Sequence, residues 1–361
     1  MQEDFSEATL SVKLSSIGHN YNILKSIANN SICSAVVKAN AYGLGVRKIS
    51  NKLINAGCTN FFVAHLNEGI ELRNIIGNDF NIFILHGPKY NQPESFHKNN
   101  LIPVINSNEQ LKLWNDFAVG ISKQLPAIIH IDTGMNRLGL NIKDAEELSK
   151  NGNATSNIDI KYIMSHLACA SEPDSKMNIE QLDKFNNIRK FFPDIPATLS
   201  NSAGILLGSE YHFDMVRPGI ALYGGGIKQD DVNIKNVIEL KSSILQIRNI
   251  DSDQTVGYGA TRTIKAGSRI ATIPIGYADG YLRSLGNNSY LYIDDVKIPV
   301  IGRVSMDMIV ADISNINNVT IDSKVEILGE NCTINSIADL AGTISYEILT
   351  NLGSRYSRKY I

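Results

Sequence analysis

The fold is decided by the stretch Ser34-Ala35-Val36-Val37-Lys38-Ala39-Asn40-Ala41-Tyr42-Gly43-Leu44-Gly45. It begins with an apolar run that is typical of a strand buried on both faces. Lys38 follows at once, and a helix-like segment then runs from Val46 to Ala56. A lysine at the end of a buried strand is poorly hydrated, so its pKa can fall and its amine becomes nucleophilic, as a Schiff-base lysine requires. Because most lysines are solvated, a surface lysine at a strand end is the alternative.

Strand-like and helix-like segments alternate along the first part of the chain. The expected strands are Ile32–Ala39, Phe61–Leu66, Ile82–Gly87, Ile102–Ser107, Ala127–Thr133, Ile160–Leu167, Ala197–Ser202 and Phe213–Gly219. The expected helices are Ile17–Ile27, Val46–Ala56, Asn67–Ile76, Asn91–Asn99, Asn108–Ala118, Ile142–Lys150 and Asn178–Phe191, with a short one at Ala203–Leu207. Eight strands, each followed by a helix or turn, predict an α/β fold with a (β/α)8 barrel of the TIM type. A doubly wound sheet alternates in a similar way.

The pattern changes after Gly224-Gly225-Gly226. Strands are expected at Val237–Ile250, Thr255–Ile264, Arg269–Tyr277, Ser289–Ile293, Lys297–Ile313 and Ser323–Leu328, with one helix at Thr333–Ala341. Turn residues separate these strands. We therefore expect two domains, a barrel over residues 1–230 and a mostly β domain over residues 231–361.

Polar residues stand where the expected barrel strands end. They are Lys38, His65, His86, Asp132, His166, Ser202 and Arg217. Active sites of such barrels lie at the carboxyl ends of the strands. The sequence therefore predicts that this end of the barrel carries the function.

Composition narrows the class of protein. The 361 residues carry a formal net charge of −2, which favours neither a nucleic-acid nor a membrane surface, and no apolar run has the ~20 residues of a membrane span. Four scattered cysteines, Cys33, Cys58, Cys169 and Cys332, suggest reduced thiols rather than disulfides or a zinc site. The first seven residues are acidic, unlike a signal peptide. A cytoplasmic protein without a metal site is expected.

The run from Val37 to Gly45 resembles the attachment motif for pyridoxal 5′-phosphate (PLP) in the alanine racemases. The resemblance covers nearly the whole chain, because further motifs follow in the family's order. It implies a barrel followed by a β domain and PLP-dependent interconversion of L-alanine and D-alanine. In bacteria it also implies a supply of D-alanine for the peptidoglycan of the cell wall.

The resemblance assigns the cofactor-binding residues. Lys38 matches the lysine that holds PLP covalently, and Tyr42 the tyrosine whose hydroxyl reaches the phosphate. In Met164-Ser165-His166-Leu167-Ala168 the histidine would lie beside the pyridine ring. The resemblance also implies that Ser202, Gly219 and Ile220 bind the phosphate. Turns after the seventh and eighth strands are the common phosphate site of such barrels, which agrees with this assignment.

Arg217 matches an arginine that faces the pyridine nitrogen. Many PLP enzymes place an acid there, which keeps the nitrogen protonated. Arginine only donates hydrogen bonds, so the nitrogen should stay unprotonated, and return of the proton at Cα is favoured over return at the ring side. This favours a racemase over a transaminase.

Substrate binding is implied for Arg137, within Ile131-Asp132-Thr133-Gly134-Met135-Asn136-Arg137-Leu138-Gly139. The family's arginine at this position helps to hold the substrate carboxylate. Many relatives steady it with a carbamylated lysine, but this chain has His130 there. A bound anion, a nearby side chain or His130 itself as an acceptor would have to replace the carbamate.

The second domain supplies the remaining implied residues. Tyr258, in Thr255-Val256-Gly257-Tyr258-Gly259-Ala260-Thr261, matches the second catalytic residue. It needs cationic or hydrogen-bonding help to act as a base, which His166 with Arg217 would provide. Tyr277 would narrow the entrance, and Met306 with Asp307 would contact substrate. Near the C-terminus, Ser354 stands where some relatives have a phosphate-binding tyrosine, so Ser354 or Tyr356 would have to substitute.

Racemisation needs one acid/base group on each face of Cα. Lys38 would serve the D-side proton and Tyr258 the L-side proton. In the family the tyrosine comes from the partner subunit, as do the residues that match Tyr277, Met306 and Asp307. The resemblance therefore implies a head-to-tail homodimer with shared active sites.

Other functions are open on the same scaffold. A broader amino-acid racemase, for example one acting on serine, is the nearest alternative. A PLP-dependent decarboxylase would pair the pyridine nitrogen with an acid, whereas this chain has Arg217. A PLP-binding homeostasis protein has the barrel but lacks the β domain, so residues 237–361 and Tyr258 count against it.

Overall fold

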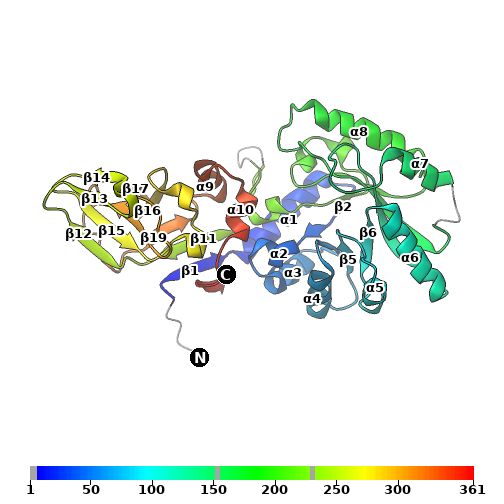
Figure 1. The fold of residues 1–361 in the computed structure, drawn as a ribbon, viewed down its shortest axis with the longest axis horizontal. Coiled ribbons are helices and arrows are strands. Elements are labelled where there is room, and N and C mark those ends of the chain that lie inside the picture. The colour runs from blue at the N-terminus through cyan, green and yellow to red at the C-terminus, as the bar shows by residue number, and fades with distance from the viewer. Residues whose placement is uncertain (1–5, 151–154, 228–231) are drawn as a thin grey trace. The chain divides into compact units, whose positions relative to one another are not determined.

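The computed structural model describes residues 6–150, 155–227 and 232–361. They form two compact units (Figure 1). The barrel unit comprises Gly18–Leu222 and Ile227–Ile234, and the β unit comprises the residues up to Ile17, Tyr223–Gly226 and Lys235–Ile361.

A closed parallel sheet forms the centre of the barrel unit. Its strands follow the order β2-β10-β9-β8-β7-β6-β5-β4-β3. They are β2 (Ile32–Cys33), β3 (Ala35–Val36), β4 (Asn60–Val63), β5 (Asn81–Ile84), β6 (Ile102–Ile105), β7 (Leu125–His130), β8 (Ile158–Met164), β9 (Ala197–Thr198) and β10 (Met215–Val216). Only Ser34 separates β2 from β3, yet β2 pairs with β10 and β3 pairs with β4. These two halves of one chain segment close the sheet into a barrel with eight strand positions.

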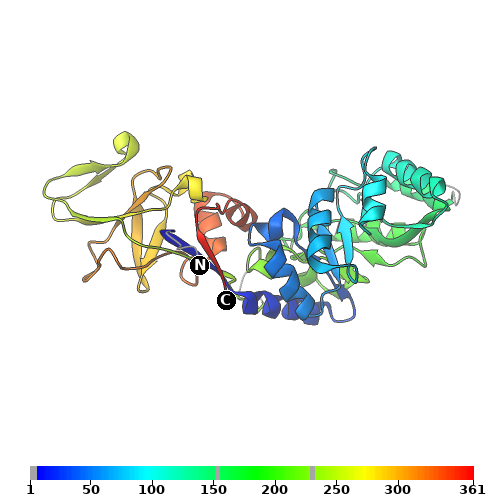
Figure 2. The ribbon, with the colours of Figure 1, turned by 90° about the horizontal axis from the view of Figure 1, so that it is seen from below.

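Helices surround the barrel strands (Figures 1 and 2). They are α1 (Leu14–Ala28), α3 (Val46–Asn55), α4 (Leu66–Ile76), α5 (Pro93–Lys98), α6 (Asn108–Gly120), α7 (Ile142–Lys150) and α8 (Lys176–Arg189), with short 3-10 turns such as Gly204–Leu206. The segment labelled α2 (Lys38–Tyr42) is not a regular helix, because residues within it have positive φ. Every residue of β4 and β6 is buried, as expected for strands that are covered on both faces. The (β/α)8 barrel is therefore confirmed.

The β unit is built on a second, largely antiparallel sheet. Its order is β12-β15-β18-β17-β16-β19-β11-β1-β20. The elements are β1 (Ala8–Val12), β11 (Ile238–Ser242), β12 (Gln246–Asn249), β15 (Arg269–Ile273), β16 (Tyr290–Ile293), β17 (Val296–Ile301), β18 (Ile309–Asp312), β19 (Val325–Leu328) and β20 (Ser357–Tyr360), with the helices α9 (Ile334–Ala341) and α10 (Ser345–Thr350). The mostly β character of this unit is confirmed. Strand β1 pairs with β11 and with β20, so strands from both ends of the described chain lie side by side.

Three expected strands of this unit are wrong in detail, because each is interrupted by a turn. The expected strand Thr255–Ile264 is a hairpin of β13 (Gln254–Val256) and β14 (Arg262–Ile264). Gly257 and Gly259 adopt φ values of 66° and 74°, which glycine reaches without steric cost and which turn the chain back. The segment Lys297–Ile313 divides into β17 and β18, and Val237–Ile250 into β11 and β12.

Candidate active site

A left-handed turn follows Lys38. Ala39, Asn40, Ala41 and Tyr42 all have φ between 52° and 55°, a conformation that costs an L-residue about 1–2 kcal/mol. The side chain of Asn40 accepts the N–H of Val46 at 2.8 Å, which ties the turn to α3. The expected strand Ile32–Ala39 therefore ends earlier, at Val36. The turn leaves Lys38 partly buried at the strand end and buries the side chain of Tyr42.

The amine of Lys38 has a lowered pKa. Burial is the main cause, because it disfavours the ammonium form, and the positive charge of Arg137 adds to the effect. The carboxylate of Glu68 acts in the opposite direction. Lys38 therefore has the property that the sequence predicts for a nucleophilic strand-end lysine.

Arg217 is buried at the end of β10 and is surrounded by acceptors. One terminal nitrogen donates to the Thr198 hydroxyl at 2.5 Å, and the other donates to the Ser165 carbonyl at 2.7 Å and the Leu199 carbonyl at 3.2 Å. Burial lowers the pKa of Arg217 to about 9, so the guanidinium remains a cation at neutral pH. Its plane is fixed by Thr198 at the end of β9 and by the carbonyls of Ser165 and Leu199, which directly follow β8 and β9.

The same guanidinium sets the tautomer of His166. A terminal nitrogen of Arg217 lies 3.2 Å from His166 Nδ1. Because arginine can only donate, Nδ1 is the acceptor and the ring proton lies on Nε2. Burial, followed by the charges of Arg217 and Arg137, holds the pKa of His166 well below its usual range. The expected arginine–histidine pair therefore forms, with a neutral imidazole.

Ser202, Gly219 and Tyr42 lie together at the barrel mouth. The hydroxyl oxygen of Ser202 accepts the N–H of Gly219 at 2.8 Å and that of Ala221 at 3.2 Å. A Cβ on Gly219 would lie 2.4 Å from the Tyr42 hydroxyl oxygen, so only glycine leaves room for that hydroxyl. The sequence-predicted residue Ile220 lies between the two N–H donors in this turn.

Arg137 lies on an ordered loop after β7. The carboxylate of Asp132 accepts the N–H groups of Gly134, Met135 and Asn136 at 2.8–2.9 Å, which fixes the loop. Arg137 itself is exposed, and no ion pair is found for it within the described residues. The guanidinium of Arg137 is thus available for a ligand.

His130 is buried beneath that loop. Its Nδ1 lies 2.7 Å from the side-chain oxygen of Asn106, so Nδ1 carries the proton and Nε2 is an acceptor. Burial, together with the charge of Arg217, lowers the pKa of His130 to about 4. His130 is therefore a neutral ring at neutral pH.

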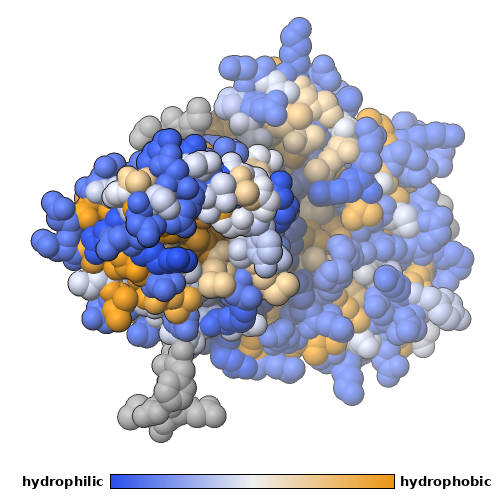
Figure 3. Space-filling view, turned by 60° about the vertical axis from the view of Figure 1, so that its left-hand side comes forward, coloured by the Kyte–Doolittle hydropathy of each residue, from blue (hydrophilic) through white to orange (hydrophobic). Residues whose placement is uncertain are grey.

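The sequence-predicted residues of the β unit gather on one segment, Gly302–Asp307. A Cβ on Gly259 would lie 2.9 Å from the Arg303 guanidinium, which places the Tyr258 turn against Arg303. The backbone N–H of Tyr277 donates to the Ser305 carbonyl at 3.1 Å. The side chains of Tyr258, Tyr277 and Met306 are 71%, 43% and 52% exposed. Figure 3, in which the β unit comes forward, shows hydrophobic surface between hydrophilic side chains on this unit.

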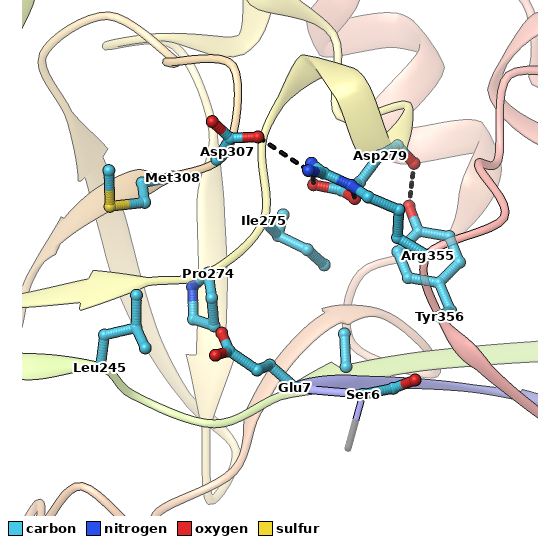
Figure 4. A pocket seen from close by; sticks show the side chains of 11 residues that line it. Ser6, Glu7, Leu245, Pro274, Ile275, Asp279, Asp307, Met308, Arg355 and Tyr356 are labelled. Carbon is cyan, nitrogen blue, oxygen red and sulfur yellow. Dashed lines mark hydrogen bonds and ion pairs between the residues drawn. The ribbon is translucent and has the colours of Figure 1, made fainter. Parts of the chain in front are cut away.

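Arg355 connects two of these loops, the one that carries Asp279 and the one that carries Asp307. It makes two bonds to the carboxylate of Asp279, at 2.6 and 2.8 Å, and a third to Asp307 at 2.8 Å. Figure 4 shows it between the two aspartates, on the wall of a cavity of about 530 Å³. Tyr356 is buried, and its hydroxyl donates to the carbonyl of Asp279, whereas Ser354 is exposed. Tyr356 is therefore already engaged within the β unit.

Two residues of this arrangement were missed by the sequence analysis. Glu68 accepts the N–H of Ala39 beside Lys38, and its position three residues after His65 at a helix start is a capping signal that could have indicated it. Arg355 has no such local signal, because both of its partners are distant in sequence.

Comparisons with known proteins agree with this geometry. Residues 12–226 match the family model described as alanine racemase, N-terminal domain, and residues 237–360 match that of the alanine racemase C-terminal domain. The chain belongs to the alanine racemase family. The prediction of an amino-acid racemase of that family, an isomerase, is thereby confirmed.

Individual relatives cover nearly the full chain. A protein of Rickettsia rickettsii (strain Sheila Smith) named alanine racemase is 43% identical over 98% of this chain and 99% of its own length. A solved alanine racemase from Bartonella henselae, described as having covalently bound pyridoxal phosphate, superposes with a TM-score of 0.94, 38% identity and 99% and 100% coverage. The biosynthetic alanine racemase of Pseudomonas aeruginosa gives a TM-score of 0.92 at 30% identity, with 99% and 100% coverage.

The described part of the chain carries neither a membrane-spanning helix nor a cluster of metal ligands. None of its helices combines the length and the apolar character that crossing a membrane requires. Among the same residues, no group of three or more His, Cys, Asp or Glu side chains is arranged to hold a metal ion.

Proposed function

We propose that this chain is a PLP-dependent alanine racemase in which Lys38 and Tyr258 exchange the Cα proton on opposite faces of the substrate. One observation carries the proposal. The lowered pKa of Lys38, the fixed guanidinium of Arg217 and the turn around Gly219 occur at the same end of the barrel strands.

The residues at the barrel mouth fit PLP. Tyr42, Ser202 and the N–H groups of Gly219 and Ile220 would hold its phosphate, and the Gly219 N–H, which donates to the Ser202 hydroxyl oxygen, would be shared with it. The missing Cβ at Gly219 leaves room for the Tyr42 hydroxyl beside them. Lys38 would hold its aldehyde carbon, and His166 would lie beside its ring. Arg217 would donate to its pyridine nitrogen, since a guanidinium has N–H donors and no hydrogen-bond acceptor. The phosphate, the aldehyde carbon and the pyridine nitrogen of the cofactor would then each have a partner of suitable chemistry.

When bound, PLP withdraws electrons from Cα of the amino acid and so makes its proton removable. Lys38 would take or return this proton on the D-side, helped by its lowered pKa. The hydroxyl of Tyr258 would do the same on the L-side, where the His166–Arg217 pair would support it. The fixed donor at Arg217 favours return of the proton at Cα.

The remaining predicted residues would bind and select the substrate. Arg137, on the loop that Asp132 holds, would pair with the alanine carboxylate. Met306 and Asp307 would contact the substrate, and Tyr277 would narrow the entrance to favour a small amino acid. Backbone hydrogen bonds join the loop of Tyr277 to the loop of Met306, which supports a common role of these loops in substrate binding.

We further propose a head-to-tail homodimer, as the family resemblance implies, in which Lys38 and Tyr258 of one site come from different subunits. Residues 1–230 would supply the PLP-binding half of each site, and residues 231–361 of the partner the half with Tyr258. The high exposure of Tyr258 supports this arrangement. The proposal includes a cytoplasmic location and a supply of D-alanine for peptidoglycan.

The purified protein tests the activity directly. It should show the absorbance band of bound PLP and convert L-alanine to D-alanine much faster than L-serine to D-serine. The Lys38→Ala variant should lose the band and the activity. A band that persists in Lys38→Ala would contradict the anchor, and equal rates with serine would identify a broader racemase.

Mixing two inactive variants tests the shared site. A dimer of one Lys38→Ala subunit and one Tyr258→Phe subunit keeps one site with both groups intact. Random mixing makes half of the dimers mixed, so about a quarter of the native activity should return. Recovery of nothing, with mixed dimers demonstrated by differential tagging, would contradict sites built from two subunits.

A further inference from the structure

Glu68 is a carboxylate at the barrel mouth that the proposed reaction does not use. One of its oxygens accepts the N–H of Ala39 at 2.7 Å. The other accepts the N–H groups of Ala64 at 2.8 Å and His65 at 3.1 Å. A single side chain at the start of α4 therefore connects the residue after Lys38 with the end of the neighbouring strand β4.

The bond to Ala39 acts on a backbone in an unfavourable conformation. Ala39 is the first of four consecutive left-handed residues, and none of the four is glycine. Within the turn, Ala39 accepts the N–H of Gly43 at 2.8 Å, and Asn40 accepts that of Gly45 at 2.9 Å. Glu68 adds a bond from outside the turn, at the residue next to Lys38. Loss of that bond would loosen the position of the amine.

The negative charge of Glu68 also acts on the ionisable groups around Lys38. Arg137 and Glu68 act on Lys38 with opposite signs, and Lys38 in turn acts on His86 and His166. His65 and His86 stand edge to face with their ring centres 4.4 Å apart, beside the same carboxylate. Glu68 thus contributes a negative charge among groups that are cationic or become cationic on protonation.

We propose that Glu68 is a positioning residue for Lys38, which holds the left-handed turn through Ala39 and balances the positive charge around the amine. The inference rests on the anchoring role proposed for Lys38. It assigns to Glu68 two effects that can be separated, because a shorter acid keeps the charge and an amide removes it.

The reaction of apoprotein with PLP reports on both effects. The neutral amine of Lys38 adds to the aldehyde carbon of PLP, a carbon–nitrogen bond forms, and the carbonyl oxygen leaves as water. Without the Glu68 charge, burial and Arg137 are less opposed, so the amine loses its proton at a lower pH. The midpoint of the pH profile of capture should therefore move to lower pH, which a purely structural defect would not cause.

The experiment removes PLP from the purified protein and follows its recapture by absorbance from about pH 6 to about pH 10. Glu68→Gln should show the shift to lower pH. Glu68→Asp should keep the native midpoint but capture PLP about tenfold more slowly, because a shortened side chain cannot reach Ala39. Asp144→Asn is the matched control, since Asp144 is a carboxylate near the start of α7 that pairs with Asn141 in the same barrel, and it should change neither quantity.

Each outcome decides a separate point. An unshifted Glu68→Gln profile, or an equal shift in Glu68→Asp, would overturn the charge effect. Native capture rates in Glu68→Asp would overturn the positioning, and this variant also serves if thermal unfolding shows that Glu68→Gln is not folded. Capture that persists in Lys38→Ala would instead remove the proposed anchor, so the two failures are distinguishable.

Discussion

The barrel mouth and the loops of the β unit are built in different ways. In the barrel, Arg217 and Ser202 are buried and have their hydrogen-bond partners on neighbouring strands and turns. In the β unit, the side chains of Tyr258 and Met306 are mostly exposed. The backbones of their loops are held by hydrogen bonds.

The difference indicates what stabilises the side-chain positions in each half of the proposed site. Buried polar groups that are held by several protein partners set one geometry before any ligand arrives, which is the property needed to hold a cofactor. In the β unit, hydrogen bonds fix the backbones of the loops, but the side chains of Tyr258 and Met306 stay exposed to solvent. The proposed dimer would cover them, so the second half of the site would depend on association.

Removal of the Tyr258 hydroxyl should give the largest effect. Tyr258→Phe loses the proposed L-side acid/base group, so racemisation should fall by about 10²–10⁴-fold, the usual contribution of such a group. The PLP band should stay, because the barrel mouth is intact. In D₂O, D-alanine should still exchange its α-proton through Lys38. Retention of racemisation would place the second base elsewhere.

Replacement of Arg217 tests the buried half. Arg217→Met leaves the carbonyls of Ser165 and Leu199 and the Nδ1 of His166 without their donor. Unfolding free energy should fall by about 3 kcal/mol, since each buried acceptor left unpaired costs about 1–3 kcal/mol and part of this is relieved by water. Chemical denaturation measures it. A stability equal to that of the native protein would mean that this network is not preorganised.

The lowered pKa of His130 should make the folding stability of the protein depend on pH. Its folded pKa of about 4 lies below the unfolded value of about 6.5, so only the unfolded state takes up the proton between these values. Stability should therefore fall as pH decreases through this window, by about 2 kcal/mol from pH 7 to pH 5. His130→Gln should flatten the dependence in urea titrations, and His166 should leave a remaining slope of the same sign. An unchanged slope in the variant would contradict a neutral buried His130.

The smallest effect is expected at Arg355. Arg355→Ala breaks the three bonds to Asp279 and Asp307, so the loops that carry Tyr277 and Met306 lose a common support. The KM for alanine should rise a few-fold up to about tenfold, with the PLP band unchanged. Lys265→Ala, which breaks the exposed pair with Asp253 in the same unit, is the control and should be neutral. An equal KM in both variants would show that the support is not needed.

The barrel could be predicted from the sequence because the patterns that indicate its strands and helices are local. Buried strands and amphipathic helices have distinct periodicities, and polar residues such as Lys38 and Arg217 mark the strand ends. The left-handed turn at Ala39 was not predictable, because alanine carries no preference for it. Pairings such as β1 with β20, and contacts such as Arg355 with Asp279, join residues far apart in sequence, and no local pattern encodes them.

The pairing of β1 with β11 and β20 has a consequence for synthesis. A growing chain exposes β1 early, yet its hydrogen-bonding partners are made only after the whole barrel sequence. The barrel residues can therefore collapse as a unit while β1 is still unpaired along both of its edges. Such an edge invites contact with other strands, and completion of the β sheet late in translation removes it.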